Sequence, residues 1–133
     1  MRSFKLEIVS PDGAKFSGEA ERLLVRTSDG DVEILAGHTD LFATLGVGRV
    51  KLTADGEARY GSASGGFLTV KGGCVTLAAV TFEFAGDIDE VRAERAKARA
   101  EEAIRTAKDD RALDAAKAKL ARAINRINVA DLK

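Results

Sequence analysis

Apolar and polar residues alternate through the first two thirds of the chain. Phe4, Leu6 and Ile8 alternate with Lys5, Glu7 and Val9. This is the period-two pattern of a strand with one buried face. Turn-forming residues such as Ser10-Pro11-Asp12-Gly13 separate the segments. Gly65-Gly66 and Gly72-Gly73 are predicted to be hairpin turns. The predicted strands are 4–9, 14–18, 21–27, 32–35, 41–45, 48–53, 59–63, 66–70, 74–80 and 82–84.

The pattern changes at Gly86. All 13 glycines lie at or before this residue, and alanine and charged residues dominate after it. Two sets of residues then recur at intervals of three or four, which is typical of one face of a helix. They are Ala93, Ala96, Ala100, Ala103 and Ala107, and then Leu113, Ala116, Leu120, Ala123, Ile124 and Ile127.

These two patterns predict an α+β fold with two domains. Eight to ten short strands without a helix between them favour a β-sandwich over residues 1–86. A short connection at Lys108-Asp109-Asp110 joins the two helices, so residues 87–133 are predicted to form an antiparallel α-helical hairpin. Asp87 is the predicted N-cap, with Glu90 three residues later as its capping-box partner. An Asp of the connection caps the second helix.

A helix pair with an alanine face buries little apolar surface. We therefore expect the hairpin to pack against the sandwich or against a partner. We also expect it to exchange between docked and extended states about a hinge at Gly86–Ala93.

Bulk composition excludes several classes of protein. The net charge is zero, so no overall field attracts nucleic acid or an acidic membrane surface. Cys74 is the single cysteine, which excludes an internal disulfide and indicates a reducing compartment. Apolar runs are too short for a signal peptide or a membrane span. We expect a cytoplasmic protein that reaches a membrane only through a membrane protein.

No catalytic constellation is evident. His38, in Gly37-His38-Thr39, is predicted to be a loop residue that hydrogen-bonds its own turn, and Cys74 to be a small buried hydrophobe. Neither has a second His or Cys in its cluster, so no metal site and no catalytic residue is predicted. An enzyme that uses His38 or Cys74 remains a weak alternative.

Four arginines form the most unusual pattern of the tail. They lie seven apart on the first helix and four apart on the second: Arg92, Arg99, Arg122 and Arg126. The antiparallel offset predicts that the second pair lies opposite residues 91–95. Converging guanidinium groups would bind a polyphosphate, and Glu83 and Asp89 could accept hydrogen bonds from a base or ribose. The alternative is four solvated arginines, some paired with neighbouring glutamates.

The order of strands followed by a helical hairpin resembles the epsilon subunit of bacterial F-type ATP synthase. The resemblance covers the whole chain. It rests on Phe16-Ser17-Gly18, Gly37-His38, Gly65-Gly66-Phe67-Leu68-Thr69-Val70 and Val75-Thr76-Leu77-Ala78. Ile88-Asp89-Glu90-Val91-Arg92-Ala93 is similar to the nucleotide motif of that family, Ile/Leu-Asp-x-x-Arg-Ala.

The resemblance implies a non-catalytic rotor subunit in the central stalk of a proton- or sodium-driven ATP synthase. Its sandwich would bind the gamma subunit and the ring of c subunits. Its hairpin would fold on the sandwich or extend along gamma toward the alpha and beta subunits and inhibit ATP hydrolysis. No cofactor is required, and ATP is a regulatory ligand of the folded form. The subunit would lie peripherally at the cytoplasmic face of the bacterial inner membrane, held there by the Fo sector.

The resemblance also assigns residues. The nucleotide motif covers Ile88, Asp89, Arg92 and Ala93, and the other nucleotide-binding positions are Glu83, Arg99, Arg122 and Arg126. Asp31 and His38 match c-ring contact positions at one end of the sandwich. Ala36 and Asp40 stand where the family usually has proline, which makes that loop looser. A stand-alone nucleotide-binding regulatory protein is the alternative function.

Overall fold

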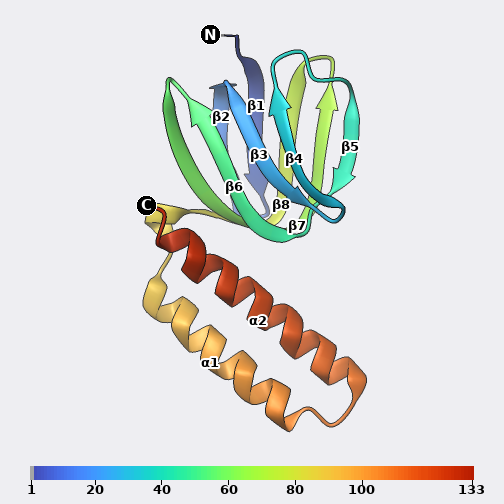
Figure 1. Ribbon diagram of the computed structural model, residues 1–133, viewed down its shortest axis with the longest axis vertical. Helices are drawn as coiled ribbons and strands as arrows, with labels where there is room; N and C mark the ends of the chain where they lie inside the picture. The colour runs from blue at the N-terminus through green and yellow to red at the C-terminus, as the bar shows by residue number, and fades with distance from the viewer. Residues whose placement is uncertain (1) are drawn as a thin grey trace.

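The computed structural model describes residues 2–133. As predicted, a β-sandwich is followed by two packed helices (Figure 1). The strands are β1 (Phe4–Ser10), β2 (Gly13–Ala20), β3 (Arg22–Thr27), β4 (Gly30–Leu35), β5 (Leu41–Thr44), β6 (Val47–Ala54), β7 (Glu57–Lys71) and β8 (Cys74–Phe84). A 3-10 turn, η1 (Ala85–Asp87), leads into α1 (Glu90–Thr106) and α2 (Asp110–Ala130).

The strands form one folded-over sheet around a single apolar core. Their order is β2-β1-β8-β7-β6-β3-β4, with β5 paired to β7. All pairs are antiparallel except β1 with β8. These are the first and last strands in the sequence, and no helix lies between them in the chain. Alternate side chains point inward, as the period-two pattern predicts. The largest fully buried ones include Leu6, Ile8, Leu23, Leu52, Leu68 and Leu77.

The prediction of a turn at Gly65-Gly66 is wrong. Both glycines lie inside β7, which runs through the segments predicted as two strands. Ser64 pairs with Thr81 and Gly66 pairs with Ala79, so the register with β8 stays the same and only Gly65 between them is left out of the pairing. Gly65 and Gly66 have φ angles of 68° and 100°, which only glycine adopts readily. The pair therefore forms a local distortion inside a continuous strand. Gly72-Gly73 does form the turn between β7 and β8.

The first helix also begins two residues later than predicted. Asp89 is the N-cap of α1, and its Oδ1 accepts a hydrogen bond from Arg92 N at 3.0 Å. Asp87 belongs to η1 instead, because the chain first buries Ile88 against Val129 and Ala130. Asp109 caps α2, accepting from Ala112 N at 2.7 Å, as predicted.

Small residues let the two helices pack closely. The buried positions of the pair include Ala93, Ala100, Ala116 and Ala123. Leu113, Leu120 and Ile127 are half-buried, whereas Ile124 is exposed and does not join the predicted face. Within residues 2–133, no helix is long and apolar enough to cross a membrane.

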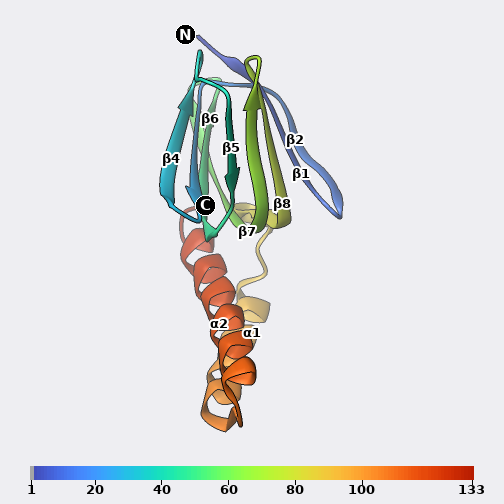
Figure 2. The same cartoon turned by 90° about the vertical axis from the view of Figure 1, so that its right-hand side faces the viewer.

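The hairpin is docked on the sandwich by one end. The C-terminal part of α2 lies against β6 and β7, and the loop that joins the helices points away from the sandwich (Figures 1 and 2). Val129 and Ala130 pack with Ala85 and Ile88, and half-buried Tyr60 packs against them. This small cluster is separate from the core of the sandwich.

Candidate functional site

A cavity between α1 and α2 brings three of the four predicted arginines together. It has a volume of about 480 Å³. Its lining is Ala96, Arg99, Ala100, Ala103, Lys119, Arg122, Ala123 and Arg126. The alanines leave room between the helices, and the long basic side chains border that space. The cavity therefore combines a small-residue floor with a cationic border.

One of these cations is tied to the sandwich. Arg126 donates from Nε to Glu83 Oε1 at 2.7 Å, and its Nη2 lies 2.5 Å from the same oxygen. Both side chains are half-buried. The pair links α2 to β8 and joins Glu83 to a residue of the cavity lining, although Glu83 itself is not part of that lining. A bidentate or charge-assisted contact of this kind is stronger than a neutral hydrogen bond.

The remaining cations of the cavity lack a carboxylate partner. Over residues 2–133, no Asp or Glu oxygen lies within 4.0 Å of the charged groups of Arg99, Lys119 or Arg122. Their like charges repel one another between the two helices, and an anion between them would reduce that repulsion. The phosphate oxygens of a nucleotide match the planar donor fork of arginine.

The other predicted residues lie outside this cavity. Arg92 is exposed on the first turn of α1, and seven residues of helical rise, about 10 Å, separate it from Arg99. The carboxylate of Asp89 is used as the helix cap. Ile88 and Ala93 are buried. The predicted helix register is also wrong, because Arg122 and Arg126 share the cavity with residues 96–103 of α1 and not with 91–95.

Two residues of the site were missed by the sequence analysis. Lys119 lines the cavity, and its spacing of three from Arg122 is the signal that places it on the same helix face. Asn125 donates from Nδ2 to Gly48 O at 3.0 Å and lies 2.9 Å from Ser62 Oγ. Asn125 lies four residues before the buried Val129, on the same face of α2, but nothing in the sequence singled out this face as the one that docks on the sandwich.

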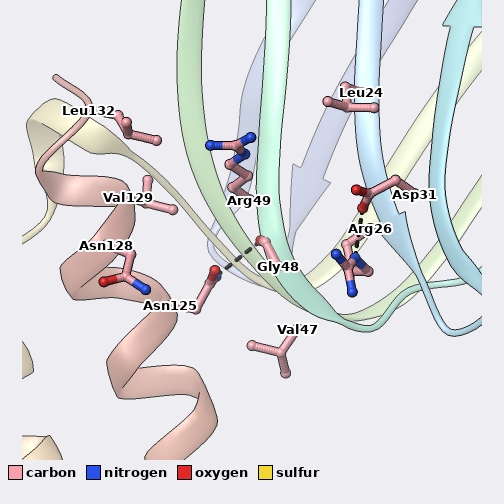
Figure 3. Close-up of a pocket in the computed structure, with 10 residues that line it drawn as sticks. All are labelled: Leu24, Arg26, Asp31, Val47, Gly48, Arg49, Asn125, Asn128, Val129 and Leu132. Carbon is pink, nitrogen blue, oxygen red and sulfur yellow. Dashed lines mark hydrogen bonds and ion pairs between the residues drawn. The ribbon is translucent and has the colours of Figure 1, made fainter.

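A second cavity, of about 510 Å³, lies where α2 meets β3, β4 and β6 (Figure 3). The sandwich contributes Arg26, Asp31 and Arg49, and α2 contributes Asn125 and Asn128. Figure 3 shows the hydrogen bond from Asn125 to Gly48 and the pairing of Arg26 with Asp31 at 2.6 Å. This cavity exists only while α2 is docked, because α2 supplies one wall.

Glycine is required at the wall of this second cavity. A Cβ built on Gly48 would lie 2.4 Å from Arg26 Cβ, which no real pair of atoms tolerates. Because Gly48 has no side chain, the side chain of Arg26 can lie against β6 at this point. Gly48 O accepts a hydrogen bond from the side-chain amide of Asn125.

Comparison with known proteins assigns the family. The model described as "ATP synthase, Delta/Epsilon chain, beta-sandwich domain" matches residues 3–85. The model described as "ATP synthase, Delta/Epsilon chain, long alpha-helix domain" matches residues 87–131. The chain belongs to the ATP synthase delta/epsilon chain family.

Individual members of the family are similar over their full length. The ATP synthase epsilon chain of Bacillus velezensis is 41% identical over 130 residues, covering 98% of each chain. The epsilon chain of Ruminococcus albus is 37% identical over 134 residues, covering both chains completely. A chain in the Euglena gracilis mitochondrial ATP synthase has the same fold, with a TM-score of 0.78 at 22% identity over 98% of this chain and 82% of that one.

Family membership makes the chain a non-catalytic, epsilon-type subunit of the ATP synthase central stalk. His38 Nδ1 lies 2.6 Å from Thr39 O. His38 therefore makes its contact within its own turn, as predicted. The prediction of a buried Cys74 is wrong: it is exposed at the start of β8, where Val75 takes the inward position. Over residues 2–133, no three His, Cys, Asp or Glu side chains are grouped to hold a metal ion.

The two predicted c-ring contacts of this epsilon-type chain do not lie at the same end. Asp31 is at the start of β4, on the side where α2 docks, and the loop with His38 follows the other end of β4 (Figure 1). The prediction that they share one end is wrong, because β4 runs the length of the sandwich between them. A single partner surface at one end of the sandwich reaches one of these residues and not both.

Proposed function

We propose that this chain is a rotor subunit whose sandwich, residues 1–86, couples the c-ring to the gamma subunit. Residues 87–133 regulate ATP hydrolysis. Full-length similarity to bacterial epsilon chains supports this function over that of a stand-alone nucleotide-binding protein. A chain of similar fold, with a TM-score of 0.64 at 12% identity, occurs in a structure described as the "central stalk/cring" of Tetrahymena thermophila mitochondrial ATP synthase; each chain is covered to 97%. The subunit would be peripheral, at the cytoplasmic face of the bacterial inner membrane, attached through Fo.

The docked hairpin would be the non-inhibitory state. Its contact with the sandwich is small: a cluster around Val129 and Ala130, the two hydrogen bonds of Asn125, and the pair between Arg126 and Glu83. Such a contact can open without disturbing the core of the sandwich. The released helices would extend along gamma toward the alpha and beta subunits and block hydrolysis.

ATP would stabilise the docked state. The observation that carries this proposal is that Arg99 of α1 and Lys119 and Arg122 of α2 line one cavity without carboxylate partners. A triphosphate held there would join both helices, and Arg126 would connect it to the sandwich through Glu83. A ligand that binds one conformation better shifts the population toward it. Arg92 and Asp89 would contribute at the motif end of the site.

An ATP titration of the purified chain by calorimetry tests the site. Saturable binding is expected for the wild type, and Arg122→Ala should weaken it at least about tenfold, since charge-assisted phosphate contacts are lost. Arg111→Ala is the matched control, because Arg111 is an exposed arginine of α2 outside the cavity. Arg92→Ala tests the motif separately. Absence of wild-type binding, or equal affinities for the Arg122 and Arg111 variants, would contradict the site.

A further inference from the structure

The cavity where α2 meets the sandwich contains a cation without a carboxylate partner (Figure 3). Two arginines of the sandwich line this cavity. Arg26 is paired with Asp31, with Nε 2.6 Å from Oδ1. Over residues 2–133, no Asp or Glu oxygen lies within 4.0 Å of the charged group of Arg49. The charged lining residues are thus two cations and one anion, so a single anionic group would neutralise them.

Apolar side chains from both walls line the same cavity. Val47 of β6 and Leu132, which follows α2, are each 37% exposed. Half-buried Leu24 of β3 and buried Val129 of α2 complete the apolar part of the lining. Single exposed apolar residues are ordinary on a protein surface. Here two of them, far apart in the sequence, border one cavity together with a cation that has no carboxylate partner, which is the mixed lining of a small-molecule site.

Two side-chain amides of α2 add hydrogen-bonding groups to the cavity. Asn128 makes no side-chain hydrogen bond over residues 2–133. Asn125 uses Nδ2 for its contacts with Gly48 O and Ser62 Oγ, so its Oδ1 can still accept a hydrogen bond. Figure 3 shows Arg49 on the sandwich and Asn128 on α2, on the two walls of the cavity. A ligand between these walls would contact both of them.

These groups match a small organic carboxylate with an apolar body. The planar carboxylate fits the donor fork of Arg49. The apolar body would cover the exposed parts of Val47 and Leu132, which removes apolar surface from water. The volume of about 510 Å³ lies within the range of small-molecule sites. A phosphomonoester carries about −1.5 to −2 charges at pH 7, which is more than the single net positive charge of the lining.

We propose that this cavity binds a small organic carboxylate, and that the bound ligand holds α2 on the sandwich. Asn128, Val129 and Leu132 supply one wall, so the complete cavity exists only in the docked form. A ligand of that form shifts the population toward it. The site is distinct from the cavity between the helices, which uses Arg122 and Arg126 on another face of α2. Binding does not depend on the function proposed above, and only an effect on ATP hydrolysis would rest on it.

The test is a calorimetric titration of the full chain with phenylbutyrate, which joins a carboxylate to an apolar body. Saturable binding is expected, and phenylbutanol, which lacks the charge, should bind at least about tenfold more weakly. Arg49→Gln should weaken phenylbutyrate binding at least about tenfold, and Leu132→Ala on the other wall should weaken it about threefold to tenfold. Arg22→Gln is the matched control, because Arg22 is an exposed arginine of β3 outside this cavity. It should bind within about twofold of the wild type.

The proposal is overturned if phenylbutyrate shows no saturable binding, or if Arg49→Gln and Arg22→Gln bind it equally well. Equal affinity for inorganic phosphate would show that the site does not select a carboxylate. An equal loss in Arg122→Ala would place the probe in the cavity between the helices. If Arg49→Gln does not fold, Arg49→Lys replaces it, since lysine keeps the charge and lacks the planar fork. A chain that binds phenylbutyrate and fails to bind ATP would contradict only the nucleotide site proposed above.

Discussion

The carboxylate of Asp89 meets two demands at one position. It caps α1 through the Arg92 amide, and it belongs to the segment that resembles a nucleotide motif. One Oδ atom holds the cap, and the other oxygen remains able to accept from a ligand. The cap fixes the direction in which α1 leaves the sandwich, so the same residue orients Arg92. A change at Asp89 will therefore affect helix stability even when no nucleotide is present.

At this scale we predict that Asp89→Ala lowers the free energy of unfolding by about 1 kcal/mol, the usual cost of losing an N-cap. Asp87→Ala is the control, because Asp87 lies in η1, two residues before the cap of α1. It should change the free energy by less than about 0.5 kcal/mol. Urea unfolding followed by helical circular dichroism measures both. A larger loss for the Asp87 variant would restore Asp87 as the cap.

The cap also shows where local sequence rules stop. Asp87 with Glu90 satisfies the capping-box spacing, so the sequence favoured it. The choice of Asp89 is made by Ile88, which is buried against Val129 and Ala130 about forty residues later. By contrast, a cap of α2 by one of the two Asp residues of the connection was predicted correctly, and Asp109 is that residue.

At the scale of elements, the long strand β7 contains two glycines, Gly65 and Gly66, whose sequence resembles that of a hairpin turn. Gly66 has φ of 100°, and a Cβ there would lie 1.9 Å from Ala78 O, in the neighbouring β8. β7 pairs with β6 before these glycines and with β5 after them, so one strand pairs with both. Alternation predicted most strand positions. The two glycines made one strand look like two, because a positive φ angle inside a strand and one in a hairpin turn both favour glycine.

Gly66→Ala is accordingly expected to destabilise the chain by about 3 kcal/mol or more, through backbone strain and a backbone clash. Gly72→Ala is the comparison, because Gly72 has φ of 56° in a turn with open space around its Cβ position. It should cost only about 1 kcal/mol, the price of a left-handed conformation. Thermal unfolding of both variants measures the two losses, and equal losses would mean that β7 tolerates a side chain at position 66.

At the scale of the whole molecule, the sandwich and the hairpin meet through a small, partly polar contact. The helical periodicity of the tail predicted a hairpin, and the resemblance pointed to the arginines that line its cavity. The sequence did not show which face of α2 docks, since Asn125 lies beside Ile124 and Arg126 in a stretch without a clear apolar face toward the sandwich. That orientation depends on Gly48 O and Ser62 Oγ, which belong to distant strands.

Asn125→Ala is predicted to release the hairpin in the whole molecule. Two neutral hydrogen bonds contribute about 1 kcal/mol each, so the ratio of docked to released hairpin should fall roughly fivefold to thirtyfold. Asn128→Ala is the matched control, because Asn128 is exposed and makes no side-chain hydrogen bond over residues 2–133. Energy transfer between a dye on exposed Cys74 and one on Lys108→Cys reports the hairpin position in the isolated chain.

In the assembled ATP synthase, Asn125→Ala should lower ATP hydrolysis, since the released helices are the inhibitory form proposed above. If the hairpin is released but ATP hydrolysis is unchanged, release of the hairpin does not cause inhibition. If energy transfer is unchanged, Asn125 does not hold the hairpin on the sandwich.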